Sequence, residues 1–209
     1  MTKQLPSRPI LRACVFLSAI ALLSACGQGG PSAAEKAAAA REAELAAEAK
    51  AREESRARIE AQRLAALWKY QHATVGGGAQ VTAAILSTDN VDTDGQGARP
   101  VQLVFRDHAS WGRSSYLVLQ GGDFDCRPRC SVSVTVDDQA PAVMAARRPN
   151  TDEAIAMFIN DAEALWRLTA GAARISIDFP VKAGGTRTAR FDVAGLDESK
   201  MPGWPAASN

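Results

Sequence analysis

The segment from Ala33 to Leu67 constrains the fold of this chain more than any other feature. It consists mostly of Ala, Glu, Arg and Lys and contains no Gly or Pro, and these four residue types are among the strongest helix formers. Large apolar side chains are sparse, so the expected helix has no wide apolar face to bury against a core. We therefore predict a solvated N-terminal helical stalk over residues 33–67, roughly 50 Å long at about 1.5 Å per residue.

A coiled coil is the alternative for this stalk. Leu45 and Ile59 stand two heptads apart, but Arg52 occupies the position midway between them. A coiled-coil seam needs apolar residues repeated in every heptad. The pattern therefore favours a single helix and leaves open pairing through Ala-rich faces.

The first 25 residues have the order of an export signal. Lys3, Arg8 and Arg12 precede an apolar run from Ala13 to Leu23, and small residues follow that run. A charged start, an apolar centre and a small-residue cleavage site are typical of a secretory signal peptide. The apolar run is too short to remain in a bilayer as a spanning helix, so residues 1–25 are expected to be removed.

The last residues of this signal, Leu23-Ser24-Ala25-Cys26, resemble the lipobox of bacterial lipoproteins. The resemblance implies cleavage before Cys26 and acylation of that residue. The Gly-rich composition that follows predicts a flexible leader over 26–32. Residue 27 is Gly rather than Asp, which by the same resemblance indicates the outer membrane. The implied location is the bacterial cell envelope, lipid-anchored and facing the periplasm; ordinary secretion with Cys26 as a bystander thiol is the alternative.

Charge and cysteine content limit the possible partners. The chain has 24 basic and 23 acidic residues and a net charge of +1, which does not favour binding to nucleic acid. Of its four Cys residues, Cys126 and Cys130 remain after the signal and the acylated residue are set aside. An oxidising compartment favours a disulfide between these two.

The composition changes after the stalk, and residues 68–197 predict a β-rich globular domain. Gly76-Gly77-Gly78 should end any helix that continues past Trp68. Val132, Val134 and Val136 alternate with Ser and Thr, which is typical of a strand with one solvated face. Short runs of this kind predict strands over 80–87, 100–105, 115–120, 131–136, 142–147, 154–159, 174–179 and 186–193.

One helix is expected late in this domain. Asn160 is its predicted N-cap, with Glu163 three residues later, and Gly171 is expected to close it in the left-handed conformation. The tail over 198–209 is expected to be loose, except that Trp204 can dock back onto the domain. Many short strands and one late helix predict a mainly β fold, either an antiparallel β-sandwich or an open barrel.

The sequence Cys126-Arg127-Pro128-Arg129-Cys130 is the most distinctive motif of the domain. Its three-residue spacing differs from the C-x-x-C of thiol oxidoreductases, so we interpret it as a hairpin loop closed by a disulfide. In the simpler interpretation the bridge only pins a turn. In the functional one, it presents Arg127 and Arg129 rigidly to a protein partner, because preorganisation lowers the cost of binding.

Other patterns give little support for a metal or a catalytic site. Asn90 to Gly95 matches the start of a calcium loop, but position twelve is Val101 instead of a carboxylate. Asp107 and His108 lie near Ser114 without the G-x-S-x-G of hydrolases. With only two His residues, the chain lacks a convincing zinc set, so no metal, cofactor or catalytic residue is predicted.

The far half of the chain resembles a group of small exported lipoproteins of Gram-negative bacteria whose function is unknown. It is also similar, more distantly, to type VI secretion-associated periplasmic proteins of the TagO/VasI kind. The resemblance rests on five stretches, at 68–70, 100–106, 122–126, 130–138 and 191–196. It implies no catalytic residues and leaves the oligomeric state open.

From these features we expect a non-enzymatic, membrane-anchored lipoprotein that binds an envelope protein. An inhibitor or immunity-type lipoprotein that blocks a cell-wall hydrolase is the first alternative, and a hydrolase using Asp107, His108 and a nearby Ser is the second.

Overall fold

The computed structural model describes residues 30–149 and 155–206, which fall into two compact units. One unit ends at Glu48 and the other begins at Ala49. The predicted signal peptide and Cys26 lie outside the described residues, as does the start of the strand expected at 154.

The helix α1 (Ala33–Leu67) confirms the predicted long N-terminal helix. It begins with a capping box, in which Ser32 Oγ accepts from the Glu35 N–H at 3.2 Å and Glu35 Oε2 accepts from the Ser32 N–H at 2.6 Å. These hydrogen bonds hold the pKa of Glu35 below its usual value. None of the residues of α1 is buried, so its own propensity and its ion pairs stabilise it rather than a packed face.

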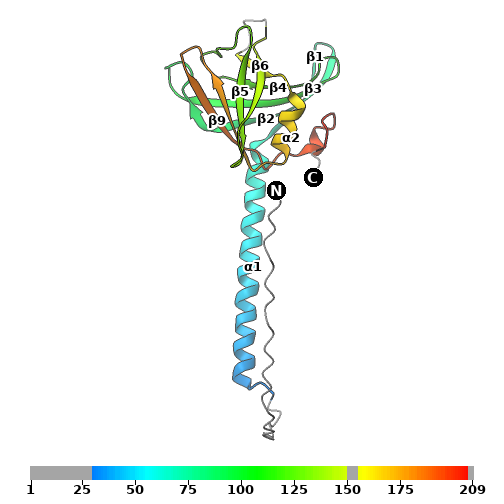
Figure 1. Cartoon of the computed structure of the whole chain (residues 1–209). Helices are drawn as coiled ribbons and strands as arrows, with labels where there is room; N and C mark the ends of the chain where they lie inside the picture. The colour runs from blue at the N-terminus through cyan, green and yellow to red at the C-terminus, as the bar shows by residue number, and fades with distance from the viewer. Residues whose placement is uncertain (1–29, 150–154, 207–209) are drawn as a thin grey trace, which may run out of the picture. The chain divides into compact units, whose positions relative to one another are not determined.

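The second unit contains one open antiparallel sheet of nine strands, which confirms the mainly β class (Figure 1). Its spatial order is β1-β2-β3-β4-β7-β6-β5-β8-β9. The strands are β1 (Lys69–Val75), β2 (Gly78–Val91), β3 (Arg99–His108), β4 (Gly112–Val118), β5 (Cys130–Val136), β6 (Ala142–Arg147), β7 (Ala156–Ile159), β8 (Arg174–Pro180) and β9 (Thr186–Asp192).

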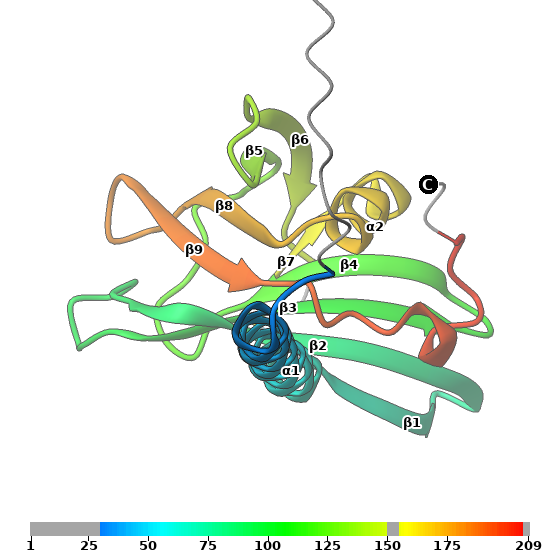
Figure 2. The same ribbon diagram turned by 90° about the horizontal axis from the view of Figure 1, so that it is seen from below.

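The sheet curls so that its last strand approaches its second. Figure 2 shows β1 to β4 side by side and β8 and β9 outside that layer, with the end of β9 close to it. Thr88 Oγ1 donates to the carbonyl of Arg190 at 3.2 Å, and the Arg190 guanidinium lies 3.0 Å from the Asp89 carboxylate. These are side-chain contacts, and β1 and β9 remain the edges of an open sheet.

The strand β1 was missed by the sequence analysis. The helix ends at Leu67, and the glycines at 76 and 77 form the tight turn of the β1–β2 hairpin instead of terminating a helix. Gly76 and Gly77 have φ angles of 54° and 79°, which two-residue hairpin turns of this kind require. The expectation about the glycine triplet is therefore wrong, because strand pairing with β2 decides the structure of 69–75.

The late helix is confirmed, but its ends differ from the prediction. Helix α2 (Ala162–Ala170) has Asp161 as its N-cap, whose Oδ1 accepts from the Ala164 N–H at 2.9 Å. Asp161 therefore takes the role expected of Asn160. Gly171 has φ −98°, so the helix does not end in the left-handed conformation.

The tail is docked as far as Pro205, which contradicts the expectation that it is loose. A short 3-10 helix, η1 (Glu198–Lys200), is followed by the buried side chains of Met201 and Trp204. The Trp204 ring lies 5.4 Å from Phe105 and 4.9 Å from Trp166, so its predicted docking is confirmed. Trp166 Nε1 donates to the carbonyl of Pro205 at 2.8 Å, which fixes the tail against α2.

The core lies on the inner face of the curled sheet. Alternation along each strand turns Phe105, Leu117, Met157 and Ile177 inward, and all four are fully buried. The outward-facing positions of β5 and β8 carry polar and charged side chains, among them Ser131, Ser133 and Asp178.

Candidate functional site

The predicted disulfide between Cys126 and Cys130 is present, with the two sulfur atoms 2.03 Å apart. Cys126 is buried, and Cys130 Sγ lies 3.5 Å from Met157 Sδ. A disulfide that closes so short a loop stabilises the fold only modestly, because it removes little conformational entropy from the unfolded chain.

The strand β8 holds the segment before the disulfide. The backbone N–H of Asp125 donates to the carbonyl of Pro180 at 3.1 Å, and Phe124 forms an isolated bridge with Val181. The Phe124 ring packs edge-on against Phe179 at 5.5 Å. The segment before the loop is therefore anchored in two ways: an aromatic contact fixes its side chain, and backbone hydrogen bonds fix its main chain.

The tip of the loop points away from the core. Arg127, Pro128 and Arg129 are all exposed, and the Arg127–Pro128 peptide bond is cis. The structure thus places both predicted partner-binding residues at an accessible position on an anchored loop.

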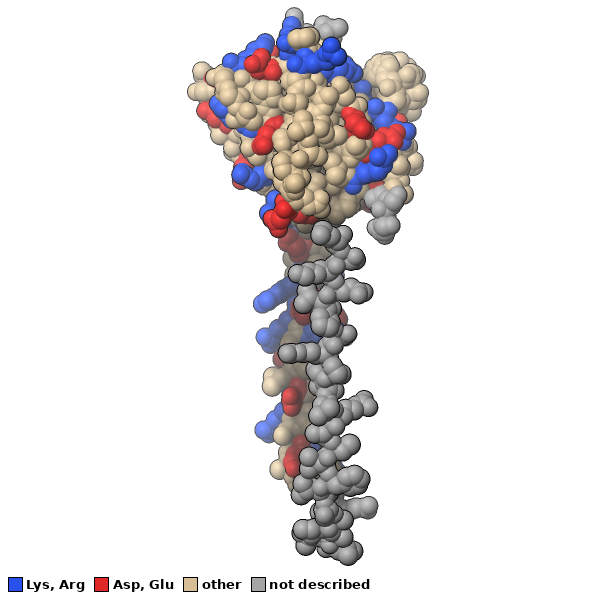
Figure 3. Space-filling model, viewed as in Figure 1, with Lys and Arg blue, Asp and Glu red and all other residues tan. Residues whose placement is uncertain are grey.

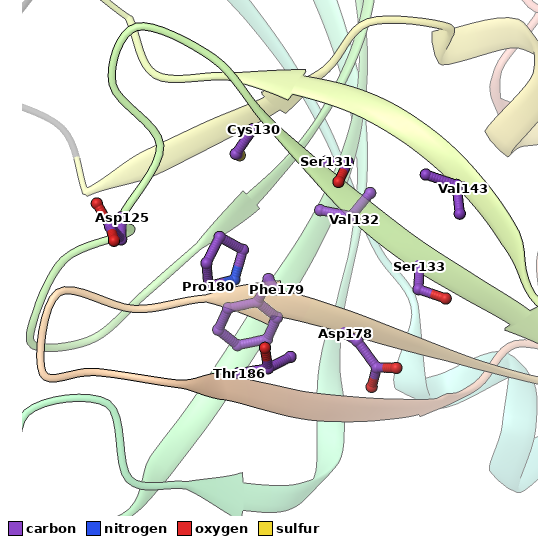
Figure 4. A pocket seen from close by; sticks show the side chains of 10 residues that line it. All are labelled: Asp125, Cys130, Ser131, Val132, Ser133, Val143, Asp178, Phe179, Pro180 and Thr186. Atoms are coloured by element: carbon purple, nitrogen blue, oxygen red, sulfur yellow. The ribbon is translucent and has the colours of Figure 1, made fainter.

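A hollow of about 540 Å³ lies next to this loop on the outer face of β5 and β8 (Figure 4). Its polar lining follows from strand alternation, because Ser131 and Ser133 point outward while Val132 is buried. Asp178, opposite Ser133 in the ladder, accepts a hydrogen bond from Thr188 Oγ1 at 2.6 Å. The lining residues are Asp125, Cys130, Ser131, Val132, Ser133, Val143, Asp178, Phe179, Pro180 and Thr186.

The chemistry of the hollow is that of recognition through hydrogen bonds. Its hydroxyl groups donate and accept, and its two carboxylates accept. Figure 3 shows acidic and basic side chains interspersed around a largely uncharged area on this face of the unit. Such a mixed surface suits a protein partner better than a polyanion.

The residues proposed for a hydrolase do not form a triad. His108 is buried, its Nε2 lies 2.8 Å from the carbonyl of Val75, and its Nδ1 accepts from the backbone N–H groups of Ser110 and Trp111. Both ring nitrogens of His108 therefore form hydrogen bonds with backbone groups. Ser114 Oγ instead accepts from Arg106 Nε at 3.0 Å.

The segment that resembles a calcium loop is a hydrogen-bonded turn. Asp92 Oδ1 accepts from the N–H groups of Asp94 and Gly95, at 3.2 and 2.7 Å. The Asp94 carboxylate accepts from the Gln96 N–H and pairs with Arg99 at 3.0 Å, and these contacts lower its pKa. Within the described ranges no group of His, Cys, Asp and Glu could hold a metal ion.

Comparisons with known proteins give no relative: no family model, no curated protein and no solved structure matches the chain. None of the helices in 30–149 and 155–206 is long and apolar enough to cross a membrane.

Proposed function

We propose that this chain is an acylated envelope lipoprotein whose β-rich unit binds a protein partner through the disulfide loop and the adjacent hollow. The observation that carries the proposal is the anchored loop, which exposes Arg127 and Arg129 beside a polar hollow. Binding surfaces are enriched in Arg, and a preorganised loop loses less conformational freedom on association.

The helix α1 supports a spacer role. It has 35 residues and no buried side chain, which is unusual for a helix that serves only to complete a core. It stands between the sequence that resembles a lipobox and the β-rich unit. A solvated helix in that position suits a spacer between an anchor and a binding unit.

The anchor is tested by replacing Cys26 with Ser in the producing bacterium. Acylation at this position predicts that wild-type protein sediments with membranes, whereas Cys26→Ser protein becomes soluble or retains its signal peptide. Two or more acyl chains hold a protein firmly, since each buried CH₂ contributes about 0.8 kcal/mol. An unchanged membrane fraction for the variant would contradict the lipoprotein proposal.

The contact site is tested by photo-crosslinking at Ser131, an exposed outward-facing residue at the rim of the hollow. Gln139, exposed in the turn after β5, is the control position. We expect a discrete adduct from Ser131 and none from Gln139. The pair Arg127→Ala and Arg129→Ala should abolish the adduct while changing stability by less than about 0.5 kcal/mol; full adduct formation by that variant would exclude the loop as a contact.

A further inference from the structure

A second surface lies on the outer face where β3, β4, β7 and β6 adjoin. Five side chains form what we term the arginine–aromatic surface: Arg106, Trp111, Tyr116, Phe158 and Arg147. The ladder places Tyr116 opposite Phe158 and Phe158 opposite Arg147. The Arg106 guanidinium carbon lies 5.5, 5.7 and 5.9 Å from the ring centroids of Trp111, Tyr116 and Phe158, and that of Arg147 lies 5.3 Å from Phe158.

The exposed ring of this surface is held in place. Trp111 is 55% exposed, yet it stacks on His108 with 3.8 Å between the centroids and 11° between the planes. His108 is itself fixed by three hydrogen bonds to backbone atoms. A Cβ placed on Gly76 would lie 2.9 Å from the Trp111 ring, so the β1–β2 turn supports the indole closely from a third element.

The two arginines carry charge that the described part of the chain does not neutralise. Within 30–149 and 155–206, neither Arg106 nor Arg147 forms an ion pair with a carboxylate. Arg106 donates through Nε to Ser114 Oγ at 3.0 Å, so its terminal N–H groups are left without a hydrogen bond to another described residue. By contrast, carboxylates pair with Arg63, Arg99, Arg113, Arg148, Arg167, Arg174 and Arg190.

We infer that the arginine–aromatic surface binds an extended acidic peptide segment of a protein partner. A guanidinium that lies against aromatic rings still offers its edge to a carboxylate, in the paired geometry that Arg favours. Side chains at alternate positions of an extended peptide lie on one face, about 6.6 to 6.8 Å apart. Because both guanidinium groups lie within 6 Å of the same Phe158 ring, two such carboxylates can reach them together.

The composition of the surface favours a peptide over other anions. Trp, Tyr and Arg are the residue types that dominate the energetics of protein interfaces, and all three occur here. Polyanions such as nucleic acids are captured by many cations on strongly basic proteins, whereas the net charge of this chain is only +1. Two arginines among aromatic rings are complementary to a peptide in which acidic and apolar side chains alternate.

This inference goes beyond the proposed function, because it assigns a second site and the chemistry of its ligand. It does not depend on the disulfide loop or on acylation, since the surface is built from other strands. The two proposals therefore fail separately: loss of the Ser131 adduct leaves peptide binding intact, and absence of peptide binding leaves membrane anchoring intact.

The test uses the full-length chain in nonionic detergent and the capped peptide acetyl-GSEFEFESG-amide, with acetyl-GSQFQFQSG-amide as the uncharged control. Trp68, Trp166 and Trp204 are buried, and the chain has four Trp residues in all. Collisional quenching by acrylamide therefore reports mainly on Trp111. We expect the acidic peptide to protect Trp111 with a Kd between about 1 μM and about 1 mM, and the control peptide to give no protection.

The variants Arg106→Gln and Arg147→Gln should each weaken binding about tenfold, as expected of interface hot spots. Arg190→Gln, which removes an exposed arginine elsewhere on the unit, is the matched control and should bind as the wild type does. Arg147 is exposed and contacts only one ring in the described structure, so its variant remains informative if Arg106→Gln folds poorly. Raising the salt from about 0.1 M to about 1 M, which shortens the Debye length from about 10 Å to about 3 Å, should also weaken binding.

Three outcomes would overturn the inference. Equal protection by both peptides would show that charge is not recognised, and unchanged binding by both arginine variants would place the site elsewhere. Protection by phosphatidylglycerol vesicles or by a carboxylated glycan, without protection by the acidic peptide, would assign the surface to a different class of ligand.

Discussion

The packing of Trp204 gives the sharpest test of the tertiary structure, because the residue lies in a tail that contains no long element of its own. Its side chain is 6% exposed and packs against both Phe105 and Trp166. Replacing a buried aromatic residue with Ala costs about 3 to 5 kcal/mol. A unit of this size changes its melting temperature by about 2 to 4 °C per kcal/mol, so Trp204→Ala should lower it by about 6 to 20 °C.

One feature of Trp204 moves the expected drop in melting temperature towards the lower end of that range. The indole Nε1 of Trp204 is buried and has no hydrogen-bond partner among the described residues. A buried donor without a partner costs about 1 to 3 kcal/mol, which offsets part of what its ring contacts contribute. Trp204→Phe keeps an aromatic ring and removes that donor, so it should lie within about 1 kcal/mol of the wild type.

The assay is thermal unfolding followed by near-ultraviolet circular dichroism. This signal reports aromatic packing, whereas the far-ultraviolet signal would be dominated by α1, in which no residue is buried. Trp111→Ala is the matched control, since it removes the same atoms from a ring that is 55% exposed, and it should cost clearly less than Trp204→Ala because less apolar area is buried. If Trp204→Ala were no more destabilising than Trp111→Ala, the docked tail would be refuted.

Three further predictions concern other parts of the chain. Burial raises the pKa of both Tyr70 and Tyr116; a raised folded pKa gives stabilisation that is complete below about pH 10 and is lost as the pH rises through the folded pKa. Phenolate absorbance should therefore appear at a higher pH in folded protein than in urea, and equal midpoints would contradict this. Replacing both Cys126 and Cys130 with Ser should cost about 2 kcal/mol by the loop-entropy estimate, measured as a lower urea midpoint, and two free thiols in native protein would contradict the bridge. An isolated 33–71 peptide should be strongly helical and monomeric by sedimentation, whereas a concentration-dependent dimer would favour the coiled coil.

Local physical chemistry was sufficient for much of this fold. Most of the helix α1 follows from propensity and capping, because none of its residues is buried and only its C-terminal end, at Leu67, packs against the core. Alternation of Val with Ser and Thr identified β5, since one face of that strand is buried and the other is solvated. The close spacing of Cys126 and Cys130 together with the expected oxidising compartment was enough to predict their disulfide.

The remaining features depend on contacts between residues far apart in the chain. The segment 69–75 has no strong pattern of its own and becomes a strand because it pairs with β2. Trp204 is fixed by Phe105 and Trp166, which precede it by 99 and 38 residues. The arginine–aromatic surface likewise combines β3, the β3–β4 turn, β4, β6 and β7. Periodicity along a chain shows which face of a strand is buried, but the order of strands in the sheet decides which side chains meet on the other face.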